Sequence, residues 1–222
     1  KAIEINPNYP NALNNLGLAL NEQGDLNAAI TSFKTALQLK PNFTDAHFNL
    51  GNTLKEHGNL SAAIASFNTV LQLKPDYAEA HFNLGNALKE QDDLNAAIDS
   101  FCRALQFKSN FQEARINLGN VLQEKGDLTA AISTYTKALE LMPNFPEAQA
   151  NLSTAELLAG NYKKGWETYE YRLHCKQGQS SLSANPLCKQ WSNETILSGS
   201  QLLLVSEQGL GDTLQFMRYV IA

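Results

Sequence analysis

Apolar residues recur along most of the chain with the spacing of amphipathic helices. In residues 44–77, Ala46, Leu50 and Leu54 recur every four residues, and a second apolar stripe follows after a short polar break. Each stripe predicts an α-helix with one buried face, because residues three or four apart lie on the same side of a helix. The pattern therefore predicts two consecutive helices in this stretch.

The same two stripes return at a fixed interval. KPNF at Lys40, KPDY at Lys74, KSNF at Lys108 and MPNF at Met142 each begin 34 residues after the last. A period of this length indicates repeated helix-turn-helix units. The predicted complete units are residues 10–43, 44–77, 78–111 and 112–145, with 1–9 as the end of a preceding unit and 146–173 as a fifth, modified terminal unit.

Small and aromatic residues occupy fixed positions in each unit. A Gly at position 8 and an Ala at position 20 allow the two helices to approach closely, and an aromatic residue at position 24 fills the space beside them. The glycines are Gly17, Gly51, Gly85 and Gly119, and the aromatics are Phe33, Phe67, Phe101 and Tyr135. Between the helices, Gly followed by Asp or Asn predicts a left-handed turn and a cap for the second helix, with Asp92-Asp93 as the weaker copy.

These positions resemble the tetratricopeptide repeat (TPR), with Leu-Gly at 7 and 8, Ala at 20 and 27, an aromatic at 24 and Pro at 32. The departures are Val70 at position 27 and Ser109 at position 32. The resemblance implies an all-α fold, a TPR right-handed superhelix of helix-turn-helix repeats whose first helices line a concave groove. A protein or peptide ligand is the expected partner in that groove.

Asparagine recurs on the face of the first helix that we expect to line the groove. Asn costs about 0.5 kcal/mol relative to Ala in a helix interior, so its recurrence needs a cause. A row of carboxamides can match the backbone of an extended peptide without reading its side chains. The alternative is that these residues bond to the backbone of the neighbouring repeat and fix the stacking angle. They are Asn15, Asn49, Asn83, Asn117 and Asn151 at position 6, and Asn52, Asn86 and Asn120 at position 9.

The sequence NLGN(T/A)LKE at Asn49 and Asn83 is similar to the repeats of O-linked N-acetylglucosamine transferases. That resemblance implies that position-6 asparagines hold substrate backbone, above all Asn49, Asn83 and Asn117.

Other residues on the first helices carry less specific signals. Carboxylates at position 2 and the lysines at position 12 are expected to form a solvated rim. His47 and His81 share position 4, where packing is expected rather than metal binding. For Phe48 and Phe82 at position 5, packing between repeats and contact with a ligand both stay open.

The helical period stops after residue 173. Residues 174–200 are rich in Ser, Gln and Asn and predict a linker. In residues 201–222 a short apolar strand, a loop with Gly209 and Gly211 and a helix beginning at Asp212 predict a truncated Rossmann-like β-α unit suited to phosphate. A nicotinamide site is not supported, because the dinucleotide pattern needs a third glycine.

GWETYEYR at Gly165, Trp191 and LLLVSEQGLGDTLQFMRY at Leu202 together resemble the junction in bacterial proteins that fuse TPRs to a glycosyltransferase domain of heptosyltransferase type. The resemblance implies that Asp212 takes the proton of the acceptor hydroxyl, and that a nucleotide sugar is the donor of a larger parent protein. Asp212 with Gln215 also fits a capping box, which needs no catalysis. This fragment alone is expected to bind and not catalyse, and the alternative function is a non-enzymatic TPR scaffold.

Composition excludes several other classes. The 17 Lys and Arg against 22 Asp and Glu give a net charge of −5 with no basic block, which argues against nucleic acid as a partner. The longest aliphatic run is too short to cross a membrane. Three cysteines without metal-ligand spacing suit a reducing compartment, so we expect a cytoplasmic protein without a metal or a cofactor in this fragment.

Overall fold

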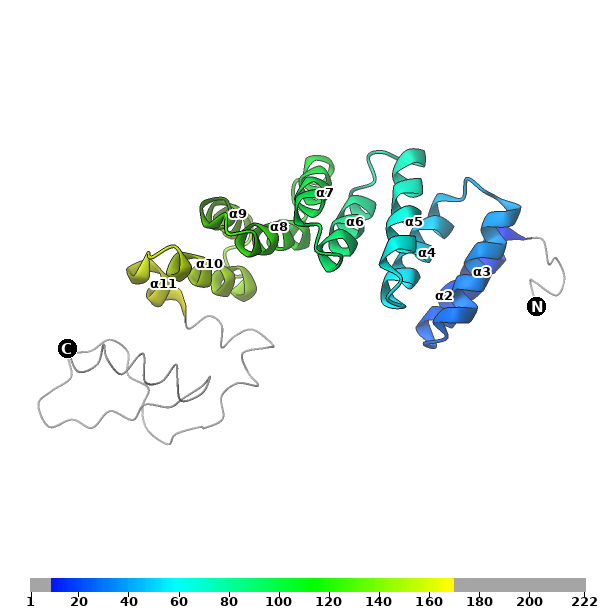
Figure 1. Ribbon diagram of the computed structural model, residues 1–222, viewed down its shortest axis with the longest axis horizontal. Helices are drawn as coiled ribbons and strands as arrows, with labels where there is room; N and C mark the ends of the chain where they lie inside the picture. Colours follow the sequence, from blue (N-terminus) through cyan, green and yellow to red (C-terminus); the bar gives the residue numbers. More distant parts are fainter. Residues whose placement is uncertain (1–8, 170–222) are drawn as a thin grey trace, which may run out of the picture.

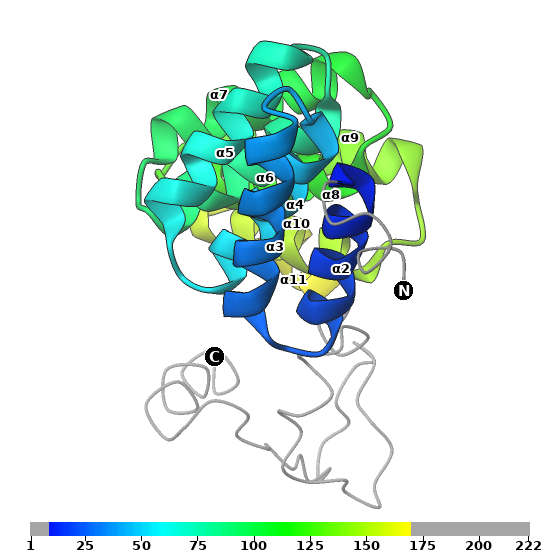
Figure 2. The same cartoon turned by 90° about the vertical axis from the view of Figure 1, so that its right-hand side faces the viewer.

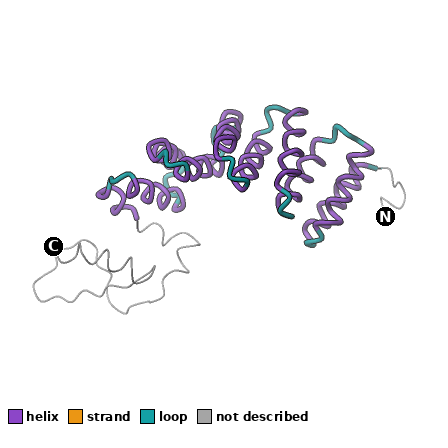
Figure 3. Tube along the Cα trace, viewed as in Figure 1, coloured by secondary structure: helices purple, strands orange, loops and turns teal. Residues whose placement is uncertain are grey.

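The computed structural model of the 222-residue chain describes residues 9–169. This part contains ten α-helices and no strand, and the helices follow one another along an elongated stack (Figures 1 and 3). The first helices of the pairs are α2 (Pro10–Glu22), α4 (Thr44–Glu56), α6 (Ala78–Glu90), α8 (Gln112–Glu124) and α10 (Pro146–Leu158). The second helices are α3 (Leu26–Leu39), α5 (Leu60–Leu73), α7 (Leu94–Phe107), α9 (Leu128–Leu141) and α11 (Tyr162–Thr168).

The helices form two layers. Every helix packs against its neighbours in the chain, and the first helices also contact the first helices of adjacent pairs. Within residues 9–169 the second helices make no such contacts with one another. The first helices therefore form the inner layer of a curved stack and the second helices the outer layer (Figure 2). The predicted all-α superhelix of helix-turn-helix units is confirmed.

The turn inside each unit has the predicted geometry. Gly24, Gly58 and Gly126 have φ values of 81°, 84° and 86°, a region that favours glycine. At the next position the side chain of Asp25 accepts a hydrogen bond from the backbone N–H of Ala28 at 3.1 Å, and the other three complete units repeat this cap. In the third unit Asp92 takes the place of the glycine at φ 65°.

Glycine at position 8 lies where the two helices of each complete unit meet. A Cβ atom added at Gly85 would lie 2.7 Å from the Cε1 atom of Phe101, and the other units repeat this contact. The aromatic side chains at position 24 are fully buried. The close approach of the two helices in each pair therefore depends on the missing side chain.

The aromatic residues at position 5 pack against the aromatic residue that ends the same unit. The ring of Phe48 stacks on that of Tyr77 with 5.1 Å between centroids, and the ring of Phe82 is tilted against that of Phe111 with 4.8 Å between centroids. Phe48 and Phe82 also pack against core clusters that include residues of the adjoining units, so of the two alternatives left open by the sequence, packing is the one observed. These contacts extend the apolar core from one unit into the next.

The fifth pair departs from the pattern. Ser153 replaces glycine at position 8 and is fully buried, with its hydroxyl bonded to the Ala150 carbonyl at 2.7 Å. A Cβ atom at Gly165 would lie 2.6 Å from the Leu157 side chain, so this pair also requires a small residue where its helices meet. The predicted linker, strand and β-α unit lie outside the described residues, and the division of the chain into units stays a prediction.

Candidate functional site

Asparagine side chains on the inner layer bond to one another across the junctions between units. At each of the four junctions the side-chain amide of a position-6 Asn donates a hydrogen bond to an Asn side-chain oxygen of the preceding unit. We call these four pairs the carboxamide row. They join Asn49 to Asn14 (3.0 Å), Asn83 to Asn52 (2.9 Å), Asn117 to Asn86 (2.8 Å) and Asn151 to Asn120 (3.0 Å).

The row differs from the structural alternative drawn from the sequence, and peptide binding stays a prediction. The partner in the neighbouring unit is a side-chain amide and not the backbone, and the bond uses only part of each carboxamide. The donating Asn keeps one N–H and its oxygen, and the accepting Asn keeps both N–H groups. Except for the buried Asn14, these side chains are half-buried. The row therefore fixes the stacking and still has polar groups to offer.

Asn15 lies outside the carboxamide row, although it occupies position 6. Its side chain is exposed and makes no hydrogen bond within residues 9–169, while the buried Asn14 forms the first pair. Position 9 of this unit is Leu18, which has no acceptor, and position 5 lies one helical turn earlier on the same face. Asn14 therefore replaces the missing position-9 carboxamide.

One outer-layer side chain reaches the carboxamide row. The hydroxyl of Tyr135 donates to the Asn120 oxygen at 2.7 Å, and the same oxygen accepts the bond from Asn151. Tyr135 is fully buried, and this burial raises its pKa well above the ordinary value. The side-chain oxygen of Asn120 therefore accepts two hydrogen bonds, and only the N–H groups of its amide remain available to another molecule.

Part of the charged rim of the inner layer is paired within the chain. The Nζ atom of Lys55 lies 3.5 Å from Oε1 of Glu90, and the Nζ atom of Lys89 lies 3.8 Å from Oε2 of Glu124. Each pair links consecutive first helices. These half-exposed pairs contribute little to stability. The hydrogen bond from Lys108 lowers the pKa of Glu79.

A second repeated contact involves position 4. The side chains there differ in chemistry, but each donates a hydrogen bond to the carbonyl at position 32 of the preceding unit. Sequence reasoning missed this contact, although all three residue types, His, Arg and Gln, have side-chain donors. The bonds join His47 to Pro41, His81 to Pro75, Arg115 to Ser109 and Gln149 to Pro143.

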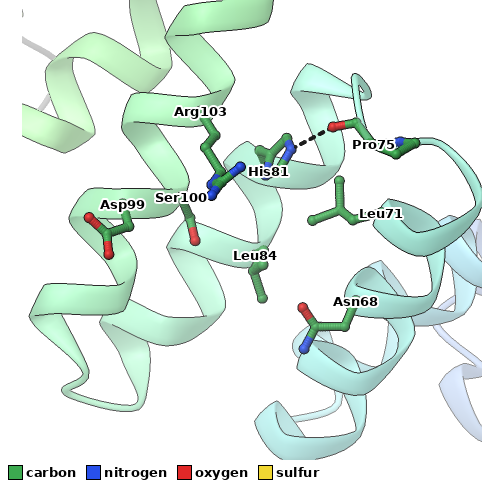
Figure 4. Close-up of a pocket in the computed structure, with 8 residues that line it drawn as sticks. All are labelled: Asn68, Leu71, Pro75, His81, Leu84, Asp99, Ser100 and Arg103. Atoms are coloured by element: carbon green, nitrogen blue, oxygen red, sulfur yellow. Dashed lines mark hydrogen bonds between the residues drawn. The ribbon is translucent and has the colours of Figure 1, made fainter.

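The outer layer has a hollow between α5 and α7, with α6 behind it (Figure 4). Its volume is about 310 Å³, and its walls include Asn68, Leu71, Asp99 and Arg103. His81, which is 6% exposed, also lines the hollow. Burial, together with repulsion from Arg103, holds the pKa of His81 below its usual value. The sequence did not predict this hollow.

The predicted catalytic and phosphate-loop residues, Asp212, Gly209 and Gly211, lie outside the described residues. Across residues 9–169 no three His, Cys, Asp or Glu side chains gather in a group that could hold a metal ion. No described helix combines the length and the apolar character that crossing a bilayer requires.

Family models match most of the repeated region. A model described as TPR repeat matches residues 17–58, 51–92 and 119–155. Models described as tetratricopeptide repeat match residues 1–31 and 78–111. No curated protein matches the sequence. None of these matches names a glycosyltransferase, so the links to O-linked N-acetylglucosamine transferases and heptosyltransferases stay predictions.

Solved structures share the fold. The chain is similar to YrrB, described as a TPR protein with an unusual peptide-binding site, at 22% identity and a TM-score of 0.68, over 81% of this chain and 92% of that one. It is similar to MamA at 25% identity and a TM-score of 0.70, over 81% and 98% of the two chains. PilF of Pseudomonas aeruginosa is similar at 23% identity and a TM-score of 0.65, over 76% of each chain.

Proposed function

The chain belongs to the tetratricopeptide repeat family of protein-interaction modules, and from this premise we propose that its inner layer binds an extended segment of a partner protein through the backbone of that segment. The observation that carries the proposal is the carboxamide row. Its pairs recur at each of the four junctions between units within residues 9–169 and keep both donors and acceptors.

An extended polypeptide is a suitable occupant for chemical reasons. Its backbone presents N–H and C=O groups at regular intervals, and carboxamides are able to bond to both. Because the pairing already fixes the orientation of each amide, binding costs less side-chain entropy than it would with free side chains. The half-buried position of the row strengthens such bonds relative to bonds in open water.

The peptide-binding site ascribed to YrrB supports the proposal, since that protein shares this fold. A finer proposal concerns the complete natural protein. The resemblance of residues 165–222 supports a nucleotide-sugar-dependent glycosyltransferase in which Asp212 is the base, Gly209 and Gly211 contact phosphate, and the repeats present the acceptor. Turnover of a nucleotide sugar by that protein, lost in Asp212→Asn, would support it, whereas absence of turnover would favour a non-enzymatic scaffold.

Substituting single asparagines by alanine does not test the inner-layer proposal cleanly, because each substitution also leaves a partner amide unpaired. Replacing both members of a pair by a similarly shaped apolar residue is nearly neutral for stability. Leu18 already stands at position 9 of the first unit. The suitable variant therefore carries Asn52→Leu with Asn83→Leu and Asn86→Leu with Asn117→Leu.

The experiment selects peptides from a random 16-residue library on the wild-type chain. Fluorescence anisotropy then measures the affinity of the selected peptides for the four-leucine variant. We expect at least a tenfold loss of affinity with an unchanged melting midpoint, while the one-sided variant Asn83→Leu melts lower. Selected peptides that bind the four-leucine variant as tightly as the wild type would contradict the proposal.

A further inference from the structure

The hollow on the outer layer exists because the second helices do not contact one another. Helices α5 and α7 do not touch, and the inner helix α6 lies between them at the hollow (Figure 4). Leu71 and Leu84 supply an apolar wall and polar side chains surround it. A volume of about 310 Å³ reaches the lower range of ligand sites and exceeds the space that one side chain needs.

His81 offers this hollow an unused hydrogen-bond acceptor. Its Nε2–H donates to the Pro75 carbonyl at 2.9 Å, and its ring stacks on Phe107 with 5.6 Å between centroids. The depressed pKa keeps the imidazole neutral near pH 7, so Nδ1 holds a lone pair. Nδ1 is buried and has no partner in the described part of the chain. Buried polar atoms are nearly always satisfied, so this one points to a donor from another molecule.

Arg103 supplies an unused cation beside that acceptor. Its side chain is exposed and makes no hydrogen bond or ion pair with any described residue. In Figure 4 the guanidinium lies next to the ring of His81. Asp99, one helical turn earlier on α7, is also unpaired within residues 9–169. Both residues border a second hollow of about 410 Å³ on α7.

This set of side chains occurs once among the complete units. The positions of Asp99 and Arg103 are occupied by Ala65 and Thr69 in the preceding unit and by Ser133 and Lys137 in the following one. Stacking therefore does not require them, because units with other residues at these positions stack in the same way.

We propose that this hollow is a second binding site that takes an acidic side chain, with its adjoining backbone, from a partner protein. The carboxylate pairs with Arg103, whose fork of donors matches its geometry. When the guanidinium of Arg103 turns from the His81 ring to the carboxylate, it uncovers the buried Nδ1, and a backbone N–H of the bound segment donates to that atom. An apolar neighbour of the acidic residue packs on Leu71 and Leu84.

Asp99 narrows the class of ligand. Its carboxylate repels a phosphate group, which carries close to two negative charges, more than a carboxylate, which carries one. It also accepts an N–H from the bound backbone. The site therefore selects a glutamate or aspartate over a phosphorylated residue.

The test titrates the 15N-labelled chain with three blocked peptides that have the sequence acetyl-Ala-Leu-X-Ala-amide. X is Glu, Gln or phosphoserine. We expect shifts of the His81 ring and Arg103 side-chain signals with the Glu peptide, with a dissociation constant on the order of 1 mM. The Gln and phosphoserine peptides should bind roughly tenfold more weakly. Equal binding of Glu and Gln, tighter binding of phosphoserine, or no shift with Glu at 10-fold this concentration would overturn the proposal.

Natural substitutions provide variants that fold. Arg103→Thr copies the preceding unit, and His81→Gln copies Gln149, which makes the same bond to its loop carbonyl. Both should weaken binding of the Glu peptide about tenfold. Lys137→Thr is the matched control in the next unit and should leave binding unchanged. The four-leucine variant of the inner layer should also bind the Glu peptide normally, which separates this proposal from the proposed function. Undiminished binding by Arg103→Thr would overturn it.

Discussion

The inner and outer layers of the stack use repetition differently. Inner helices contact one another, and at each junction the same residue type makes the same bond. Outer helices do not contact one another within residues 9–169, and their polar surface changes from unit to unit. Side chains that recur along the chain therefore include those that hold the stack, whereas the polar side chain of Arg103, which bonds to no described residue, is free of that task.

The junction between the layers should show the largest effect of a single substitution. Gly85→Ala places a Cβ atom 2.7 Å from the Phe101 ring and should destabilise the chain by about 1–3 kcal/mol through overpacking. Urea unfolding measures the loss. In a Phe101→Leu background Gly85→Ala should lower the free energy of unfolding by less, because the ring that the added Cβ atom would contact is absent. An equal penalty in both backgrounds would show that the layers do not meet in this way.

Tyr135 belongs to the outer layer but bonds to an inner-layer side chain, so its substitution tests how far the two layers act separately. Tyr135→Phe removes the hydroxyl that bonds to Asn120 and should cost about 0.5–1.5 kcal/mol in urea unfolding. The reciprocal change Phe101→Tyr places a hydroxyl near Asn86 and should be close to neutral, because a partner is available there. If Tyr135→Phe has no effect, the bond to the carboxamide row does not stabilise the fold.

The turn that leads from α6 to α7 should show the smallest effect, and it has the opposite sign. Asp92 has a φ of 65° where the other complete units have glycine. Asp92→Gly should therefore stabilise the chain by about 0.5–1 kcal/mol, since the left-handed region is strained for residues with a side chain. A higher unfolding midpoint in urea is the expected result, and an unchanged or lower midpoint would contradict it.

The sequence predicts the fold well because each unit has similar residues at the positions that form its helices, its cap and the contact between its helices. Gly85 and Phe101 recur at the period of the repeat, as do the capping residues, and the structure uses them as their chemistry suggests. The candidate residues of the inner layer were found for the same reason. Their pairing was missed, since it joins position 6 of one unit to position 9 of the unit before it, a relation visible only once the stacking is known.

The hollow on the outer layer could not be predicted from the sequence, for a different physical reason. The hollow lies where α5 and α7 have no contact with each other, which depends on how consecutive units stack. Which nitrogen of His81 is left without a partner among the described residues depends on which ring nitrogen faces the loop carbonyl. Neither follows from spacing along the chain, although the lone Arg103 in an otherwise repetitive pattern was a usable signal.

The most direct test of the central claim is an amide-to-ester scan of one library-selected peptide. Each ester removes one backbone N–H and leaves the side chains intact. If the carboxamide row reads the backbone, ester replacement should weaken binding severalfold at regularly spaced positions, while alanine replacement of side chains has smaller effects. Binding that tolerates every ester but fails on loss of particular side chains would contradict the account.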